Sequence, residues 1–331
     1  MLFNHFKKII SLVLRLFKLT FENILFRYFI KLPVSLLMAK RLFCDKSRTY
    51  LVICNHIGDF LITMGFLDAF KAQHHISAVT ICITPKMEGI ASRYLGSEDQ
   101  IICLKRRKLN WLLFLNVSRF TSEWIRKQGN IWLMEPSGHF TDAYFAFMLH
   151  FPRMTLRKVI QYGCLHLPEY APFVPLPLRP VINKEVPKKK RILLCPFVQG
   201  DWVGKVPMDL FESLITAVIH RGDYEIFTNI GSGEKSETAI SGTQPLSTTL
   251  EELEQWLSPE DCVIGFRSGM MDYLAYLPCH FVCLYPYGSR HNVFYSLDML
   301  PNTRGNYHEL QLSEDTAENV RQIINEFISM Y

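Results

Sequence analysis

The polar segment Asn55-His56-Ile57-Gly58-Asp59 separates two apolar runs and offers two kinds of chemistry. A His oriented by a carboxylate can take a proton from a hydroxyl, as in acyl transfer, when the two residues stand in an H-x4-D spacing. Here Asp59 follows His56 by three positions, and Leu61 occupies the place where that spacing needs a carboxylate. The spacing therefore excludes a His–Asp acyl-transfer dyad.

The same segment fits a substrate loop between a strand and a helix. Residues 49–54 predict a strand, and residues 59–72 predict the helix that follows it. Open α/β sheets bind ligands at the carboxyl ends of their strands, and Gly58 leaves room for a substrate beside the backbone. In that position Asp59 can accept a proton from an acceptor hydroxyl. A helix-capping role for Asp59 is the alternative.

Two series of alternating strands and helices position these residues, and a proline-rich segment at 168–190 separates the two series. Such alternation predicts parallel sheets, so we expect an α/β protein with two Rossmann-like domains that face each other across a cleft. We expect an arm at 1–46, an N-terminal domain at 47–175, a linker at 176–190 and a C-terminal domain at 191–331. The predicted strands are 49–54, 77–84, 100–104, 130–135, 159–163, 191–197, 224–230, 262–266 and 280–286; the predicted helices are 59–72, 86–94, 110–127, 139–149, 207–221, 247–257, 269–277 and 315–329.

The positive charge of the chain is concentrated in the arm. Residues 1–46 contain nine Lys or Arg and two acidic residues, whereas the whole chain has a net charge of +5. The body is therefore slightly acidic, which argues against a nucleic acid partner. The arm has the pattern of a cationic amphipathic helix, which favours an anionic membrane surface as partner. Packing of its apolar face on the protein's own body is the alternative.

Nine cysteines are distributed along the chain without the spacing of a zinc site or a CxxC pair. Most of them stand in or beside apolar, strand-like runs, which is typical of small buried side chains in a reducing compartment. The arm carries charges throughout and lacks the clean apolar core and cleavage site of a secretory signal. We therefore expect a cytoplasmic protein, peripheral on the inner face of the cytoplasmic membrane.

Three segments, taken in order, resemble the heptosyltransferase-like glycosyltransferases of bacterial surface polysaccharides. The first is "NHIGDFLITMGFLDAFK" at 55–71, where a Gly-Asp opens a helix. The second is "LCPFVQGDWVGKVPMDLFESLI" at 194–215, and the third is "VIGFRSGMMDYLAYLPCHFVCLYP" at 263–286. The resemblance covers most of residues 49–330 and implies the two-domain GT-B fold.

The resemblance also implies roles for particular residues. It makes Asp59 the general base and brings Lys205 to the diphosphate of a nucleotide-sugar donor. Ser268 and Gly269 would bind phosphate oxygens at a turn that opens a helix. The loop after the strand at 224–230 would contact the nucleoside, although an ordinary strand-to-helix loop is the alternative there. Its candidate residues are Thr228, Asn229 and Gly231.

The sequence departs from the family's pattern at two positions of the third segment. The family usually has an acidic residue before the Ser-Gly pair and a His three residues after its glycine; here Arg267 and Asp272 stand in these places. Arg267 can bind a diphosphate with two hydrogen bonds, and Asp272 can accept from a ribose or sugar hydroxyl. Alternatively, Arg267 and Asp272 form a structural ion pair. These departures leave the donor sugar open.

Acceptor contacts are expected from the loops of the N-terminal domain. Asn55, His56 and Gly58 belong to the first of these loops, and Glu135 and His139 follow the strand at 130–135. The basic run at 105–108 could contact an anionic glycolipid. The sequence offers no metal-ligand cluster and no cofactor motif, so we expect metal-independent catalysis in which Lys and Arg offset the charge of the leaving group.

The sequence thus predicts a glycosyltransferase that moves a sugar from a nucleotide-sugar to a lipopolysaccharide, capsule or other glycolipid acceptor. Direct displacement with inversion at the anomeric carbon follows if Asp59 is the base. A retaining transferase of the same fold is one alternative. The other is a non-catalytic, membrane-peripheral assembly protein that keeps the fold for binding, and the changed positions 267 and 272 motivate it.

Overall fold

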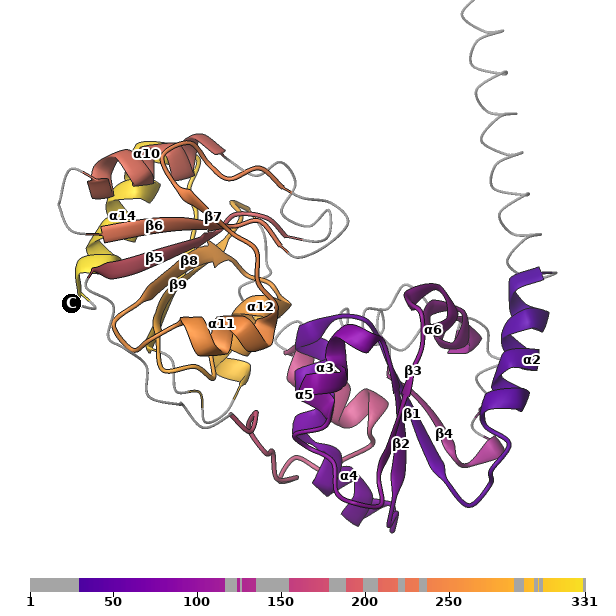
Figure 1. The fold of residues 1–331 in the computed structure, drawn as a ribbon. Helices are drawn as coiled ribbons and strands as arrows, with labels where there is room; N and C mark the ends of the chain where they lie inside the picture. The colour runs from indigo at the N-terminus through magenta and orange to yellow at the C-terminus, as the bar shows by residue number, and fades with distance from the viewer. Residues whose placement is uncertain are drawn as a thin grey trace, which may run out of the picture.

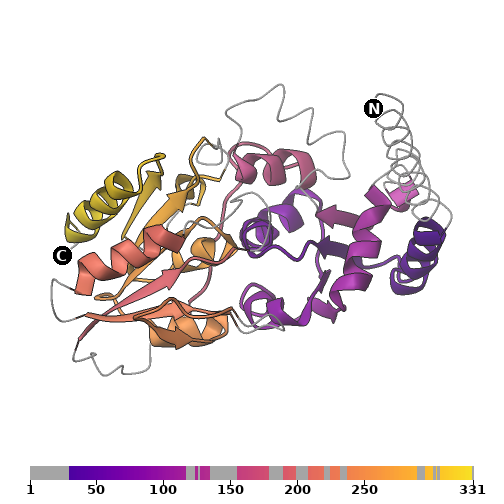
Figure 2. The same cartoon turned by 90° about the horizontal axis from the view of Figure 1, so that it is seen from above.

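The computed structural model describes residues 30–116, 124–125, 127–134, 155–178, 189–198, 208–219, 224–231, 237–288, 295–300, 303 and 306–329. These residues form two α/β domains, each built on one parallel sheet with helices beside it (Figures 1 and 2). The α/β class with parallel sheets, predicted from the alternation of strands and helices, is confirmed.

The N-terminal sheet has the order β3-β2-β1-β4, and all neighbours run parallel. Its central strand, β1, is buried along almost its whole length, as expected for an aliphatic strand covered on both faces. The elements of this domain are β1 (Thr49–Ile53), α3 (Ile57–Gly65), α4 (Leu67–Gln73), β2 (Val79–Ile83), η2 (Pro85–Met87), α5 (Glu88–Ala91), β3 (Gln100–Cys103), α6 (Arg106–Leu113), η3 (Phe114–Asn116), β4 (Ile131–Met134), α9 (Leu156–Lys158) and η4 (Val159–Cys164).

The C-terminal sheet has the order β10-β9-β8-β5-β6-β7, again with every neighbouring pair parallel. Its two central strands, β5 and β8, are apolar and buried where they pair. The elements of this domain are β5 (Lys190–Cys195), α10 (Met208–Ile219), β6 (Tyr224–Asn229), β7 (Gln244–Leu246), α11 (Leu250–Trp256), β8 (Cys262–Phe266), α12 (Gly269–Leu274), β9 (His280–Tyr285), η5 (Leu297–Met299), β10 (Asn306–Gln311) and α14 (Thr316–Ser329).

The strand orders fix where ligands can bind. Read from β7, the C-terminal sheet has the doubly wound order 3-2-1-4-5-6, whose direction reverses between β5 and β8. The N-terminal sheet reverses between β1 and β4. Open sheets bind ligands outside the carboxyl ends of the strands at such a reversal. The loops after β1 and β8, which hold Asp59 and Arg267, therefore occupy favourable positions for ligand binding.

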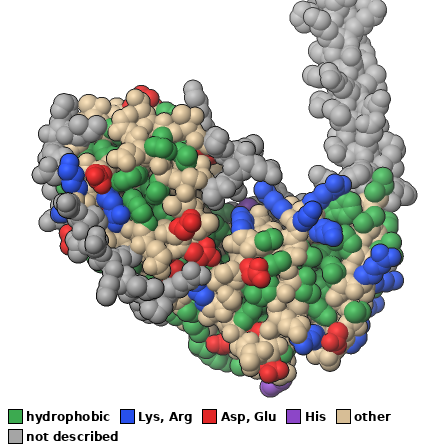
Figure 3. Space-filling view, viewed as in Figure 1, with side chains coloured by type: hydrophobic (Ala, Val, Ile, Leu, Met, Phe, Trp, Pro, Cys, Tyr) green, Lys and Arg blue, Asp and Glu red, His purple; other side chains and the backbone are tan. Residues whose placement is uncertain are grey.

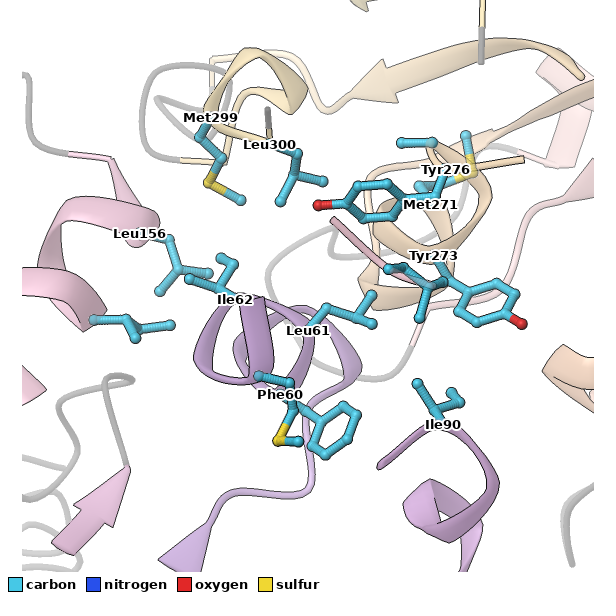
Figure 4. Packing of buried hydrophobic residues seen from close by; sticks show 14 of the residues in the cluster. Phe60, Leu61, Ile62, Ile90, Leu156, Met271, Tyr273, Tyr276, Met299 and Leu300 are labelled. Atoms are coloured by element: carbon cyan, nitrogen blue, oxygen red, sulfur yellow. The ribbon is translucent and has the colours of Figure 1, made fainter. Parts of the chain in front are cut away.

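A continuous apolar core joins the two domains. Helix α3 is buried on all sides from Gly58 to Gly65, which fits its almost uniformly apolar sequence. One side of α3 packs on its own domain, and its other side meets α12. Figure 4 shows Leu61 of α3 on the side that faces α12, and Leu61 and Ile62 belong to one buried cluster with Met271 of α12 and with Tyr276, which follows that helix.

Helix α2 (Leu32–Leu42) is the described part of the predicted arm, and it packs on the N-terminal domain. Its Ala39 side chain is buried with Phe43 and Tyr50, so this part of the arm follows the alternative of packing on the protein's own body. Residues 1–29 lie outside the described part of the chain. Within the described residues, no helix combines the length and apolar character that crossing a membrane requires.

Several sequence expectations need correction. The strand predicted at 159–163 is a π-helical turn, because Thr155 caps a short helix that continues into this segment. The helix predicted at 59–72 is two helices that meet at Phe66. Strands β7 and β10 were missed by the sequence analysis. Six cysteines are buried as expected, whereas Cys44 and Cys103 are exposed.

Candidate functional site

The loop after β1 and the first turn of α3 contain four of the predicted residues. Asn55 accepts a hydrogen bond from the Thr84 hydroxyl at 2.6 Å, which ties this loop to the end of β2. His56 is exposed and precedes α3, whose first turn contains Gly58 and Asp59. The His56 side chain does not cap the helix. The backbone N–H groups in the first turn of α3 therefore receive no hydrogen bond acceptor from the His56 side chain.

Asp59 is a buried carboxylate, with 7% of the residue exposed. The thiol of Cys54 donates to its Oδ2 atom at 3.0 Å. Burial raises the pKa of Asp59 above its ordinary value, while His56, the Cys54 thiol and the charge of Arg267 act in the opposite direction. A carboxyl group with a raised pKa suits proton transfer near neutral pH. In the arrangement described here, however, a substrate has little access to it.

Arg267 and Asp272 form a buried ion pair, so this alternative from the sequence is confirmed. Arg267 Nη2 lies 2.5 Å from Asp272 Oδ1, and the two side chains are 4% and 1% exposed. Arg267 also donates from Nε to the Tyr295 carbonyl at 2.7 Å and from Nη1 to the Ser268 carbonyl at 2.8 Å. All three nitrogens of the guanidinium thus have protein partners, and no face of it is free for a diphosphate.

The ion pair is close but incomplete. The contact between Arg267 Nη2 and Asp272 Oδ1 does not have the alignment of a hydrogen bond, so both atoms are buried without one. Burial raises the pKa of Asp272 to about 6, against the opposing charge of Arg267. The neighbouring charge of Asp59 raises it further. Two carboxyl groups from different domains therefore influence each other at this junction.

Gly58 and Gly269 allow the two domains to touch. A Cβ on Gly58 would collide with Asp272 Oδ2. A Cβ on Gly269 would lie 2.8 Å from Ile57 Cβ and 2.9 Å from the Gly58 nitrogen. The first turns of α3 and α12 thus meet at two positions where only glycine fits.

The loop after β6 places the predicted nucleoside residues in two different environments. Thr228 is fully buried, and its hydroxyl pairs with the Thr243 hydroxyl at 2.6 Å, which fixes the chain before β7. Asn229 donates to the Met270 sulfur at 3.1 Å, so it lies beside α12. Gly231 adopts a positive φ of 70°. Asn229 and α12 therefore come together, whereas Thr228 faces the core.

Three predicted residues lie outside the described part of the chain: Lys205, Glu135 and His139. Among the described residues, no group of three His, Cys, Asp or Glu side chains could hold a metal ion. Predictions about donor phosphate at Lys205 and about acceptor contacts at Glu135 and His139 stay predictions.

A contact that the sequence analysis missed joins the domains beside α12. Arg93, which follows α5, pairs with Glu254 of α11 at 2.8 Å, and both side chains are nearly buried. Glu254 also accepts from the Tyr273 hydroxyl at 2.9 Å. No local pattern could have indicated this pair, because the two residues stand in separate domains.

Comparisons with known proteins agree with the fold. No protein-family model and no curated protein sequence matches the chain. Among solved structures, it resembles E. coli ADP-heptose lps heptosyltransferase II at 15% identity, with a TM-score of 0.51 over 85% of this chain and 98% of that one. The fold is that of the GT-B glycosyltransferases.

Two further solved structures are similar to this chain. The dodecameric iron-containing heptosyltransferase TibC, in complex with ADP-D-beta-D-heptose, matches at 11% identity and a TM-score of 0.51 over 86% of this chain and 77% of that one. A glycosyl transferase family 9 protein from Veillonella parvula matches at 14% identity and a TM-score of 0.49, over 86% of this chain and 97% of that one. The heptosyltransferase-like resemblance of the three segments is confirmed at the level of the fold.

Proposed function

We propose that this protein is a glycosyltransferase that moves a sugar from a nucleotide-sugar donor to an acceptor hydroxyl. The observation that carries this proposal is that the strand-order reversals of the two sheets lie next to each other. Asp59 follows β1 at one reversal, Arg267 follows β8 at the other, and α3 contacts α12 between them. Ligands of two α/β domains bind where these points face each other. The similar solved structures include heptosyltransferases, one of them with ADP-D-beta-D-heptose bound.

The donor is proposed to bind the C-terminal domain at the carboxyl ends of β5 and β8. Asn229, Gly231, Ser268 and Gly269 border this edge of the sheet, and Lys205 belongs to the loop after β5. Because the Arg267 guanidinium has three protein partners, we assign the compensation of diphosphate charge to Lys205 and to backbone N–H groups. Arg267 and Asp272 would shape this edge without contacting phosphate.

Asp59 is the proposed general base. The acceptor oxygen attacks the anomeric carbon while the bond from that carbon to the diphosphate oxygen breaks, and the acceptor proton passes to Asp59. This direct displacement inverts the anomeric configuration. The raised pKa of Asp59, caused first by burial, supports a role as proton acceptor near neutral pH. No metal ion takes part in the proposed step.

The first experiment screens ADP-, UDP-, GDP-, CDP- and TDP-sugars for turnover, with the nucleoside diphosphate as the measured product. Asp59→Asn should lower turnover about a hundredfold or more and leave the affinity for the nucleoside diphosphate unchanged. Turnover should persist in the presence of a chelator. Normal turnover of Asp59→Asn would refute the assignment of Asp59 as general base. The anomeric configuration of the product, compared with that of the donor, would distinguish inversion from retention.

A non-catalytic binding protein is the second candidate. The internal pairing of Arg267 and the burial of Asp59 favour it, because both side chains are withdrawn from substrate in the arrangement described here. The same screen distinguishes the two functions: a nucleoside diphosphate that binds, without turnover of any nucleotide-sugar and acceptor, would favour the assembly protein.

The acceptor is proposed to be a glycolipid presented at the inner face of the cytoplasmic membrane. The four consecutive basic residues Lys105–Lys108 are exposed at the start of α6, and the first turn of that helix contains no acidic residue. Burial, and secondarily the nearby positive charge of Arg106, lower the pKa of Lys86. Figure 3 shows basic side chains on the upper side of the N-terminal domain, the part of the molecule where Figure 1 places α6.

Helix α2 adds apolar groups beside this basic surface. Leu37 is more than half exposed, Lys40 and Arg41 are exposed near the end of the helix, and Ile30, just before α2, is also more than half exposed. Apolar and basic groups together favour an anionic bilayer surface. This surface supports the proposed peripheral location.

Vesicle sedimentation tests the membrane partner with phosphatidylcholine vesicles prepared with and without phosphatidylglycerol. Binding should require the anionic lipid and weaken as salt increases. The double variant Arg106→Glu/Arg107→Glu should lower partitioning roughly tenfold or more, since each basic residue contributes about 1 kcal/mol at an anionic surface. Lys158→Glu/Lys189→Glu is the matched control, because both lysines are exposed elsewhere. Equal losses in both variants would refute the assignment of this surface.

A further inference from the structure

The first turns of α3 and α12 meet through two glycines and one carboxylate. Asp272 of the C-terminal domain lies against Gly58 of the N-terminal domain, at the place where a side chain on residue 58 would begin. On the other side of the contact, Gly269 lies against Ile57 and the Gly58 backbone. Neither glycine has a positive φ. Glycine is needed at both positions because a side chain would collide with atoms of the other domain.

Asp272 is held in this place from within its own domain. Arg267 contacts it at 2.5 Å, and Arg267 is itself held by the carbonyls of Tyr295 and Ser268. The carboxylate is therefore held in place by a guanidinium that is itself fixed by two backbone carbonyls. A rigid group of the C-terminal domain thus bears directly on the first turn of α3.

Asp59 lies beside the same contact. It follows Gly58 in the first turn of α3, is 7% exposed, and is close enough to Arg267 and Asp272 for their charges to interact with its own. Figure 4 shows Leu61 on the side of α3 that faces α12 and Phe60 on the opposite side. The interdomain pair between Arg93 and Glu254 adds a second, polar attachment beside α12. The state described here is therefore one in which the domains are docked and Asp59 is shielded.

We propose that Asp272 is a positioning residue which, held by Arg267, rests on Gly58 and keeps Asp59 buried until α12 separates from α3. An acceptor hydroxyl reaches Asp59 only after this separation. That consequence rests on the proposed role of Asp59 as general base, whereas the docking contact itself does not.

Hydrogen–deuterium exchange followed by mass spectrometry tests the contact in the full chain, without any substrate. Gly269→Ala should raise the exchange rate of the first turn of α3 about tenfold, because the new methyl group meets backbone and Ile57 across the junction. Gly58→Ala should raise exchange in α12, which lies in the other domain. Gly96→Ala is the control, since a Cβ there meets only Asp99 Oδ2 at 3.6 Å.

A double-mutant cycle separates this role from a merely local one. In an Asp272→Ala background, Gly58→Ala should have little further effect on α12, because the carboxylate that the methyl group would strike is gone. Exchange that rises only in the mutated domain, or effects of Gly58→Ala that are the same with and without Asp272, would overturn the proposal. If the exchange results hold while Asp59→Asn keeps normal turnover, the docking contact stands and the general-base assignment fails.

Discussion

Two buried Arg–Asp pairs in the C-terminal domain have the same chemistry and different surroundings. Arg191 and Asp261 meet through two contacts, Nε to Oδ1 at 3.0 Å and Nη2 to Oδ2 at 2.5 Å. Asp261 also accepts from the Ser258 amide and hydroxyl, and Arg191 stacks on Trp256 at 4.1 Å. Arg267 and Asp272 share one misaligned contact. The first pair is complete within its domain, whereas the second is shaped by the domain opposite.

The position in the sheet explains the difference. Arg191 stands at the start of β5 and Asp261 directly before β8, so their pair lies at the amino edge, away from the junction. Arg267 directly follows β8 at the carboxyl edge, where ligands of such sheets bind. An ion pair with all its partners stabilises the fold, and an incomplete pair beside Gly58 and Asp59 can respond to what approaches it.

The largest expected effect is on the complete pair. Asp261→Asn should lower the free energy of unfolding by about 3 kcal/mol or more, because it leaves the Arg191 guanidinium buried without its carboxylate. Calorimetry of the full chain measures this as an earlier transition of the C-terminal domain. Hydrogen exchange at the first turn of α3 should not change; a change there would show that the two pairs are not independent.

A smaller effect is expected where a pair joins the domains. Arg93→Met should cost about 2 kcal/mol, because Glu254 keeps its hydrogen bond from the Tyr273 hydroxyl after Arg93 is removed. The loss should appear as separation of the two domain transitions in calorimetry. Lys71→Met, which breaks the pair with Asp99 inside the N-terminal domain, is the control and should leave the transitions coupled.

Asp272→Asn should have a smaller effect still, about 1 kcal/mol or less near neutral pH. The substitution removes an ion pair, but it also removes a buried negative charge that the surroundings already disfavour, as the raised pKa of Asp272 shows. Denaturation at pH 7, side by side with Asp261→Asn, measures the contrast. Equal losses in the two variants would contradict the distinction between the complete and the incomplete pair.

The smallest expected effect is on the pH dependence of folding stability. The pKa of Asp272 rises from 3.8 to about 6 on folding, so the folded protein binds more protons than the unfolded chain within that window. This group's contribution to stability should therefore fall as pH rises from 3.8 to about 6, and Asp272→Asn should flatten that slope. The groups that influence Asp272 in the fold are Arg267, Asp59, Glu309, Tyr276 and Cys283.

A slope that is the same in the wild type and in Asp272→Asn would assign the pH dependence to other carboxyl groups, with Asp59 the first to examine because burial raises its pKa too.

Local sequence determined most of the elements. The apolar run at 262–266 predicts β8 with the bounds that the structure gives it, because a strand buried on both faces is apolar throughout. Strands β7 and β10 were missed since they lie at the edges of the sheet and are only partly buried, so their sequences lack that signal. The run at 159–163 was misassigned because a short apolar segment fits helix and strand equally.

The sequence by itself also placed Asp59 and Arg267 at strand ends and Asp272 in the helix that follows the second of these strands, and it offered the ion pair as one of two possibilities. Only the tertiary structure decided between them, since pairing depends on how Arg267 is held by Ser268 and Tyr295. The approach of Gly58 to Gly269 and the pair between Arg93 and Glu254 have no sequence signal at all. Each joins residues of separate domains, and contacts between domains depend on how two finished surfaces fit together.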